Sequence, residues 1–268
     1  MPPAKNHAGV VAKRQDVLAA LETGMRKPEL VDHLSLSRST VDRAIDELQE
    51  ASLVERDGSH YVTTYAGRES LAAYEGYLDR LDALAEAQPV LSALPPDVDV
   101  DPAALEGAQV VQSTPAAPEG PIEVNVDPVQ RAETLRTTSP VVAPRYLEAV
   151  DNLIESGTDI ELVYTEAAFE ALSTTYESAL KRVEAAADVH GFVTDRPIPY
   201  IVWTAEVPDG TISGLIVHDD TGLVGLINND TEAMNEWART EYERYRADAE
   251  QVYWSNIPVD MYRSPLSQ

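Results

Sequence analysis

The distribution of proline divides this chain more firmly than any other feature of its sequence. Eight of the eighteen prolines lie between Pro89 and Pro128, and proline interrupts both helices and central strands. Before this stretch the apolar pattern is helical, and after it strand and helix patterns alternate. We therefore predict an N-terminal domain over residues 1–90, a linker over residues 91–107 and a C-terminal domain over residues 108–268.

The net charge of the chain indicates the salt concentration to which the protein is adapted. Acidic residues outnumber basic residues 46 to 20 in 268 residues, and only four of the basic residues are lysine. With 44% hydrophobic residues the chain is folded and acidic, not a disordered acidic tail. A strongly hydrated acidic surface resists precipitation in molar salt. We therefore expect a halophilic protein.

Two absences narrow the chemistry. The chain has no cysteine, which excludes disulfides, thiolate metal sites and cysteine nucleophiles. No stretch approaches 18 consecutive apolar residues, and the first thirteen residues contain no apolar signal core. These patterns predict a cytoplasmic protein that does not enter the membrane.

The acidic residues are unevenly distributed along the chain. Residues 1–70 carry 9 basic and 11 acidic side chains, whereas the remaining residues carry 11 basic and 35 acidic ones. A nearly neutral segment in so acidic a chain favours contact with a polyanion, and double-stranded DNA is the partner we expect.

Helical periodicity in this segment predicts a helix-turn-helix. Helices are expected over residues 8–22, 28–34 and 37–54, and only Ser35–Leu36 separates the second from the third. Ser37 is suited to cap the third helix. The first residues of the second helix in such a motif face the major groove of DNA. The side chains expected there are Arg38, Ser39, Thr40, Asp42 and Arg43.

A hairpin is predicted after the third helix. Asp57-Gly58 is a strong turn signal between short strands over residues 53–56 and 60–63. A two-stranded hairpin after a recognition helix is the wing of a winged helix-turn-helix. The residues that flank this wing are better placed for phosphates than for bases, namely Arg56, His60 and Arg68. Arg38 and Arg43 have an alternative role as solvated residues that pair with acids of their own helix.

The sequence pattern of residues 8–75 resembles a known class of domain. It reads L-x-L-S-R-S-T-V-x-R-A-I-x-E-L at the third helix and Y-x-x-T-x-x-G-R after the wing. Both resemble the winged-helix domains of archaeal and bacterial regulators. The resemblance implies DNA binding. The alternative is a winged helix that contacts another protein of the transcription machinery and binds no ligand.

The helix expected after the wing carries a heptad seam. Leu71, Tyr74, Leu78, Leu81 and Ala85 follow at spacings of three and four residues. DNA regulators of this size usually read two half-sites, so we predict a homodimer contact along this seam. Packing against the first helix of the same domain is the alternative.

Alternating strand and helix patterns predict an α/β domain with a mixed sheet in the C-terminal part, so the fold class is α/β plus winged helix. A strand is expected at residues 108–112 in front of it. Further strands are expected at residues 140–143, 159–164, 189–193, 200–205, 211–218 and 223–227, with helices at 145–155, 166–187 and 230–251.

The C-terminal part also resembles a known family, most clearly in the segment DTEAMNEWARTEYERY at residues 230–245. Residues 104–252 are similar to the sensor domain of archaeal methanogenesis-type transcriptional regulators. The resemblance implies an archaeal regulator with an α/β sensor domain related in fold to one half of a phospholipase D. Trp237, Tyr242 and Tyr245 are expected in the core of this domain rather than at a ligand.

The phospholipase-like fold raises the question of catalysis. That reaction needs a nucleophilic histidine followed two residues later by lysine. None of the five histidines has lysine at that position. No glycine-rich phosphate loop or G-x-S-x-G elbow occurs, and His218-Asp219-Asp220 fits a hairpin turn better than a cation site. We therefore predict that the chain is not an enzyme and uses no metal or cofactor.

A small-molecule effector of such a sensor is expected in the crevice outside the carboxyl ends of the strands. The polar residues that follow predicted strands are the candidates for this site. They are Tyr164, Thr165, Glu166, Thr194, Asp195, Arg196, Asn228 and Asn229.

Overall fold

The computed structural model describes residues 3–252, with side chains from residue 7 onward apart from residues 126–128. The described chain divides into two compact units between Asp82 and Ala83. Within the described part, no helix is long and apolar enough to cross a membrane.

The first unit contains the helices and the hairpin that the sequence predicts. Its elements are α1 (Pro3–Ala20), η1 (Leu21–Thr23), α2 (Lys27–Leu34), α3 (Arg38–Glu50), β1 (Val54–Asp57), β2 (His60–Thr63) and the first part of α4 (Tyr65–Leu91). Leu18, Leu30, Ile45 and Leu48 are fully buried between the helices. This order of elements is that of a winged helix-turn-helix.

Local signals set the boundaries of α3 and the wing. The Ser37 hydroxyl accepts a hydrogen bond from the Thr40 backbone N–H at 3.2 Å and so caps α3. The helix ends at Glu50, earlier than predicted, because Ser52 adopts a positive φ of 60°. In the hairpin Asp57 pairs with His60, and Gly58 takes the positive φ at the first position of the two-residue loop.

Gly67 allows α4 to start close to the turn before the wing. A Cβ atom at this position would lie 2.1 Å from the backbone oxygen of Leu53 and 2.6 Å from Cγ2 of Thr63. Only glycine fits there without a shift of the backbone.

The second unit is built on one mixed sheet. Its described strands follow the order β10-β6-β5-β4-β7-β8-β9-β3. The strands β4, β5 and β6 are parallel, and every other pairing is antiparallel. The mixed sheet is therefore confirmed. The strands are β3 (Gln109–Gln112), β4 (Thr134–Ser139), β5 (Asp159–Thr165), β6 (Val189–Thr194), β7 (Tyr200–Val207), β8 (Gly210–Asp219), β9 (Gly222–Asn229) and β10 (Glu250–Val252).

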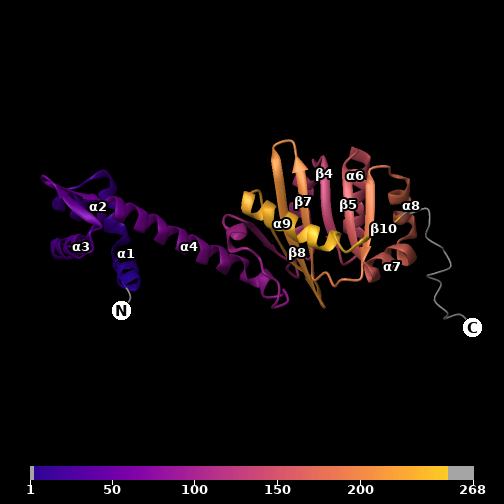
Figure 1. The fold of residues 1–268 in the computed structure, drawn as a ribbon, viewed down its shortest axis with the longest axis horizontal. Coiled ribbons are helices and arrows are strands. Elements are labelled where there is room, and N and C mark those ends of the chain that lie inside the picture. Colours follow the sequence, from indigo (N-terminus) through magenta and orange to yellow (C-terminus); the bar gives the residue numbers. More distant parts are fainter. Residues whose placement is uncertain (1–2, 253–268) are drawn as a thin grey trace, which may run out of the picture. The chain divides into compact units, whose positions relative to one another are not determined.

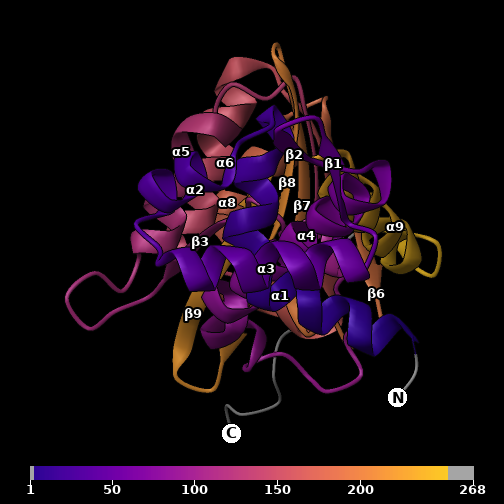
Figure 2. The same ribbon diagram turned by 90° about the vertical axis from the view of Figure 1, so that its left-hand side faces the viewer.

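Helices cover both faces of this sheet. One face carries α5 (Gly120–Val129), α6 (Pro144–Ser156), α7 (Glu166–Thr175) and α8 (Glu177–Ala185). The other face carries α9 (Glu232–Arg246), η2 (Pro102–Leu105) and the end of α4. The opposite positions of α6 and α9 are visible in Figures 1 and 2. The unit therefore has two apolar cores, one on each side of the sheet.

The prediction of a strand at residues 140–143 is wrong. The strand at this point is β4, which pairs with β5 and β7, and residues 140–143 lead into α6. Its sequence TLRTTS looks polar, but Thr137 and Thr138 are buried. The Thr138 hydroxyl donates to the backbone oxygen of Tyr200 at 3.2 Å and accepts from the backbone N–H of Val202 at 2.9 Å. Burial between two neighbouring strands therefore selects a strand that local polarity does not indicate.

Other predicted boundaries also differ. The helix expected at residues 166–187 is two helices, because Tyr176 leaves the helical region with φ −119° and ψ 37°. The last helix ends at Arg246 instead of residue 251, and β10 follows it. The helix α5 has no counterpart among the predicted elements, because Pro121 and Pro128 interrupt its apolar pattern.

The residues predicted as a linker contribute to the core of the second unit. Ala104 and Leu105 are buried there together with Ala87 and Val90 from the end of α4. The end of α4 packs closely against β9, since a Cβ atom on Gly225 of β9 would lie 2.6 Å from Cγ2 of Val90. This core includes chain on both sides of the proline-rich segment.

Candidate functional site

The third helix presents two different faces. Val41, Ala44, Ile45 and Leu48 are buried, at the i, i+3, i+4 and i+7 positions of an amphipathic helix. The first turns expose the opposite face, which carries four of the five residues predicted to contact bases: Arg38, Ser39, Asp42 and Arg43. Thr40 is half-buried. The structure therefore brings these five residues together at one end of α3.

Of the three acids that were the alternative partners of Arg38 and Arg43, namely Asp42, Asp46 and Glu47, two hold other cations and Asp46 is exposed. Asp42 accepts from Lys27 Nζ at 2.7 Å, which ties α3 to the start of α2. Glu47 binds Lys13 and Arg14 of α1, each at 2.9 Å. Within residues 3–252 neither Arg38 nor Arg43 forms an ion pair. Both guanidinium groups are available to an external partner.

The short polar side chains of the first turn are held by one another. The Ser37 hydroxyl lies 3.0 Å from that of Ser39 and 2.8 Å from that of Thr40. These contacts fix the hydroxyls beside the helix N-terminus, where backbone N–H groups and the helix dipole favour an anion. Serine and threonine at this end are therefore well placed for phosphate oxygens.

The wing is anchored to the rest of the first unit. Met25 and Tyr61 exchange backbone hydrogen bonds of 3.1 and 2.8 Å. The Lys27 ammonium group lies 5.4 Å from the centre of the Tyr61 ring. This contact adds Lys27 to the basic residues near the wing, and no spacing in the sequence indicated it.

The three residues predicted to contact phosphates lie on the wing or just after it. Arg56 Nε donates to the Gly58 oxygen at 2.9 Å, so its side chain follows the hairpin loop. The His60 ring is exposed beside Ser59. Arg68 extends from α4 and donates through Nη1 to the Thr63 oxygen at 2.9 Å. All three are exposed, and two have part of their donors occupied by backbone.

The strand-end residues of the second unit have structural roles. The Thr165 hydroxyl accepts from the Ala168 N–H at 3.2 Å and caps α7. The Thr194 hydroxyl is buried and accepts from the Arg196 N–H at 3.1 Å. Glu166 and Asp195 are exposed next to them. Arg196 pairs with Asp248 at 3.1 Å.

The predicted grouping at one edge of the sheet fails for two asparagines. The strand β9 runs opposite to β4, β5 and β6, so its carboxyl end lies toward the amino ends of those strands. Asn229 donates to the backbone oxygens of Ala104 and Glu106 at 3.3 and 2.7 Å. Asn228 donates to Asn125 at 3.4 Å. The structure does not bring these two residues to Tyr164, Thr165 or Thr194.

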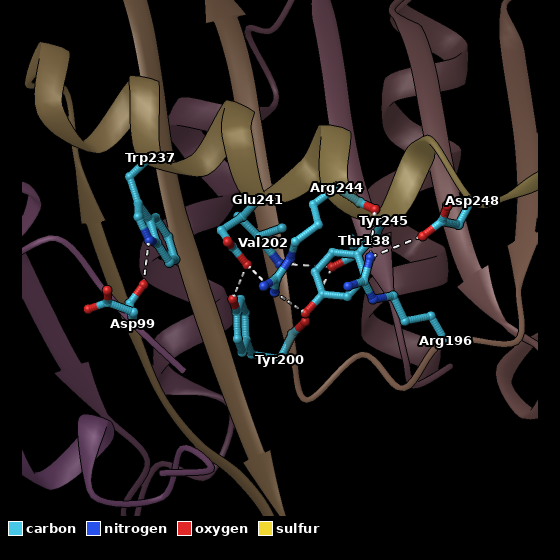
Figure 3. A network of polar contacts seen from close by, with 10 residues as sticks. All are labelled: Asp99, Thr138, Arg196, Tyr200, Val202, Trp237, Glu241, Arg244, Tyr245 and Asp248. Atoms are coloured by element: carbon cyan, nitrogen blue, oxygen red, sulfur yellow. Dashed lines mark hydrogen bonds and ion pairs between the residues drawn. The ribbon is translucent and has the colours of Figure 1, made fainter. Parts of the chain in front are cut away.

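Trp237 and Tyr245 of the last helix lie among polar contacts on the face of the sheet that α9 covers (Figure 3). The Tyr200 hydroxyl donates to Glu241 at 2.5 Å, and Arg244 bridges Glu241 and the Tyr245 hydroxyl at 2.6 and 2.9 Å. Burial and the Glu241 carboxylate raise the pKa of Tyr200, so it remains a donor. Trp237 stacks on Tyr200 with ring centres 6.2 Å apart.

Two of these aromatics confirm the predicted core assignment. Tyr242 and Tyr245 are buried, and the Tyr242 hydroxyl donates to Glu161 at 2.9 Å. Trp237 is partly exposed and donates to the Asp99 oxygen at 3.0 Å. No group of three metal-ligating side chains occurs in the described part of the chain.

Comparison with known families gives two matches. Residues 7–86 match the model of the HVO_A0261 N-terminal domain. Residues 118–248 match the model of the methanogenesis regulatory protein FilR1, middle domain. The second match confirms, over these residues, the resemblance to methanogenesis-type regulators seen in the sequence. No curated protein matches the chain.

Two solved structures show distant similarity to this chain. TrmBL2, an archaeal chromatin protein with a novel mode of DNA binding, is 10% identical with a TM-score of 0.42, over 91% of this chain and 94% of that chain. Nuc, a phospholipase D family member from Salmonella typhimurium, is 16% identical with a TM-score of 0.39, over 54% of this chain and 97% of that one.

Proposed function

We propose that this chain is a DNA-binding transcriptional regulator, and that the free guanidinium groups of Arg38 and Arg43 at the start of α3 read base edges in the major groove. The observation that carries the proposal is that both are exposed and unpaired within residues 3–252, while the nearby acids Asp42 and Glu47 hold other cations. A bidentate arginine–guanine contact contributes about 1–3 kcal/mol of discrimination. The match to a model of a regulatory protein supports the same function.

Arginine suits this task in concentrated salt. At about 1 M salt the Debye length is about 3 Å, so long-range attraction to phosphate is screened. Short bidentate contacts keep their strength because both partners lose their solvent at the contact. A halophilic archaeal regulator therefore gains more from a few well-placed arginines than from a broad basic surface.

Selection from a random duplex library tests the proposal. The full chain in about 2 M KCl, the regime in which short contacts dominate, should enrich one sequence motif. The double variant Arg38→Ala/Arg43→Ala should enrich none. Arg239→Ala, an exposed arginine of α9, is the matched control and should select the same motif as the unmodified chain. Equal enrichment by the double variant contradicts the base-reading role of these two arginines, whereas no enrichment by the unmodified chain favours a winged helix that contacts protein.

Homodimer formation belongs to the same proposal. Regulators of this size usually bind DNA as dimers, in which each winged helix reads one of two half-sites. The outward side chains of α4 support it, because Tyr77 is 56% and Leu81 43% exposed in the single chain. A second copy would cover this apolar surface.

The remaining parts of the proposed function concern the second unit. We propose that this unit binds a small effector. We also propose that the protein is cytoplasmic and is not an enzyme. The sequence similarity to a regulator's middle domain supports a sensing role. The missing histidine–lysine spacing gives no support to phospholipase-type catalysis.

A further inference from the structure

A cavity of about 110 Å³ lies between the sheet and the helices α5 and α6 of the second unit. Its wall includes side chains from both helices and from β4, β5, β7 and β8. Most of these side chains are apolar. The side chains with a polar group include Asn125, Thr137, Tyr146, Tyr164 and Trp203.

Among the residues whose side chains the structure describes, none that lines the cavity is charged. Arg145 of α6 lies next to the lining residue Tyr146, but it is paired with Glu123 and with Glu148. His218 hydrogen-bonds the Tyr146 hydroxyl at 3.1 Å, and burial lowers the pKa of His218, so it is neutral at pH 7. A buried ion without a counter-charge is strongly disfavoured. The cavity therefore excludes ionised ligands.

One donor in the wall has no partner. Trp203 is 3% exposed, and its indole Nε1 is buried without any hydrogen bond to the described residues. Trp237 on the opposite face of the sheet donates its Nε1 to the Asp99 oxygen. A buried donor left unsatisfied costs about 1–3 kcal/mol, and such a group is an expected point of contact for a ligand.

The other polar groups of the wall are engaged or weakly available. The Thr137 hydroxyl donates to the Thr138 oxygen at 3.1 Å, and Asn125 accepts from Asn228. Burial raises the pKa of the Tyr164 hydroxyl, so this group also stays protonated. Trp203 Nε1 is thus the buried donor of the described wall that lacks a partner, and it requires an acceptor from a ligand.

We propose that this cavity binds a neutral, mainly apolar molecule whose carbonyl oxygen accepts a hydrogen bond from Trp203 Nε1. The apolar wall supplies affinity through burial, and the indole N–H supplies orientation. The proposal rests on the proposed function only in calling this molecule the effector. The binding site itself is independent of DNA.

The size of the cavity limits the ligand. The cavity volume of about 110 Å³ corresponds to several waters, at about 10–15 Å³ each. A molecule of about ten non-hydrogen atoms fits this space, and small ligands of this kind gain at most about 1.5 kcal/mol per atom. Acetophenone, an aromatic ketone of this size, is a suitable probe.

A titration with acetophenone tests the site. The indole N–H signals in ¹H–¹⁵N spectra of the full chain report on binding. The signal of Trp203, assigned by its loss in Trp203→Phe, should move downfield because a new hydrogen bond deshields the indole proton. The signal of Trp237 should stay in place. An unchanged Trp203 signal at saturating probe overturns the proposal.

Matched variants test the donor. Trp203→Phe should bind acetophenone about three- to tenfold more weakly, as expected for one lost hydrogen bond. Trp237→Phe removes the same group outside the cavity and should bind within twofold of the unmodified chain. Affinity for both variants is read from the ring signals of the probe, and circular dichroism checks their fold. Equal binding by the two variants overturns the role of Trp203.

A filled cavity provides a second variant. Ala149→Phe on α6 places a ring in the lining and should abolish binding of acetophenone. The titrations contain no DNA, so a failure of the duplex selection above overturns the regulator proposal alone. Binding that persists in Ala149→Phe overturns the assignment of the ligand to this cavity.

Discussion

At the scale of single residues, the position of an acid decides which arginines are free. Asp42 and Glu47 share α3 with Arg38 and Arg43, yet each holds a cation from another helix. The sequence left these pairings open, since two arginines and three acids on one helix allow several combinations. Only the packing of α1 and α2 against α3 decides between them.

The arginines of the first unit should separate into two classes when each is replaced. Arg38→Ala and Arg43→Ala should each cost about 1–3 kcal/mol at the selected sequence and relax specificity there. Arg56→Ala should weaken all duplexes alike, because phosphate contacts carry no sequence information. Fluorescence anisotropy with the selected and a scrambled duplex distinguishes the classes. A uniform loss for all three variants argues against base reading by α3.

The ion pair of α1 with α3 should give the stability of the first unit a dependence on pH. Hydrogen bonds from Arg14 and Lys13 lower the pKa of Glu47 from 4.5 to about 2. The carboxylate therefore stabilises the fold above pH 4.5, and this contribution is lost as the pH falls toward 2. Glu47→Gln should melt earlier than the unmodified chain at pH 6, with a difference that shrinks on acidification.

Thermal melts monitored by circular dichroism at several pH values measure this difference. Glu50→Gln removes a carboxylate from the same helix and is the matched control, because Glu50 is exposed and has no ion-pair partner among residues 3–252. A pH-independent difference for Glu47→Gln would show that the ion pair does not contribute.

At the scale of elements, α4 combines two of the alternatives that the sequence left open. Leu71 is 3% exposed, and Leu71 and Tyr74 pack in the core of the first unit. Further along the helix the seam residue Leu81 is exposed, and so is Tyr77, which lies beside the seam. The predicted heptad seam is therefore internal at its start, and only its later part is available to another chain.

Replacing the outward apolar residues should disrupt a dimer. Tyr77→Glu/Leu81→Glu places two charges on the proposed contact and should convert the dimer to a monomer in light scattering. Ala72→Glu adds a charge to an exposed position on another side of α4 and should leave the dimer intact. A dimer that survives the double change must form through a different surface.

Elements with strong local signals could be predicted from the sequence, and those fixed by distant contacts could not. The Ser37 cap and the Asp57-Gly58 turn lie next to the helix and hairpin that they define. The strand β4 depends instead on β5 and β7. The cavity residue Trp203 also gave no local signal, because its missing partner is a property of the surrounding elements.

At the scale of the whole molecule, charge should govern the response to salt. Residues beyond position 70 carry 35 acids against 11 bases, so cation uptake by their carboxylates near DNA opposes cation release from the duplex. We expect affinity for the selected duplex to fall weakly, or to rise, between about 0.1 and 2 M KCl. Counterion release alone gives a slope of about −0.9 per phosphate contact.

Anisotropy titrations over this range of salt measure the slope, with circular dichroism to check the fold at each concentration. Replacing KCl by a salt of the same ionic strength with a larger cation serves as the control for specific cation uptake. A steep negative slope with an intact fold argues against the halophilic interpretation.

The short strands at the two ends of the sheet bear on aggregation. Among the described residues β3 has four residues and β10 only three, so each edge offers few backbone groups to a strand from another chain. In molar salt the repulsion between acidic surfaces is screened within about 3 Å and no longer keeps chains apart. The length of the edge strands does not change with salt. Short edge strands therefore still limit the pairing of sheets from two chains at salt concentrations that screen charge repulsion.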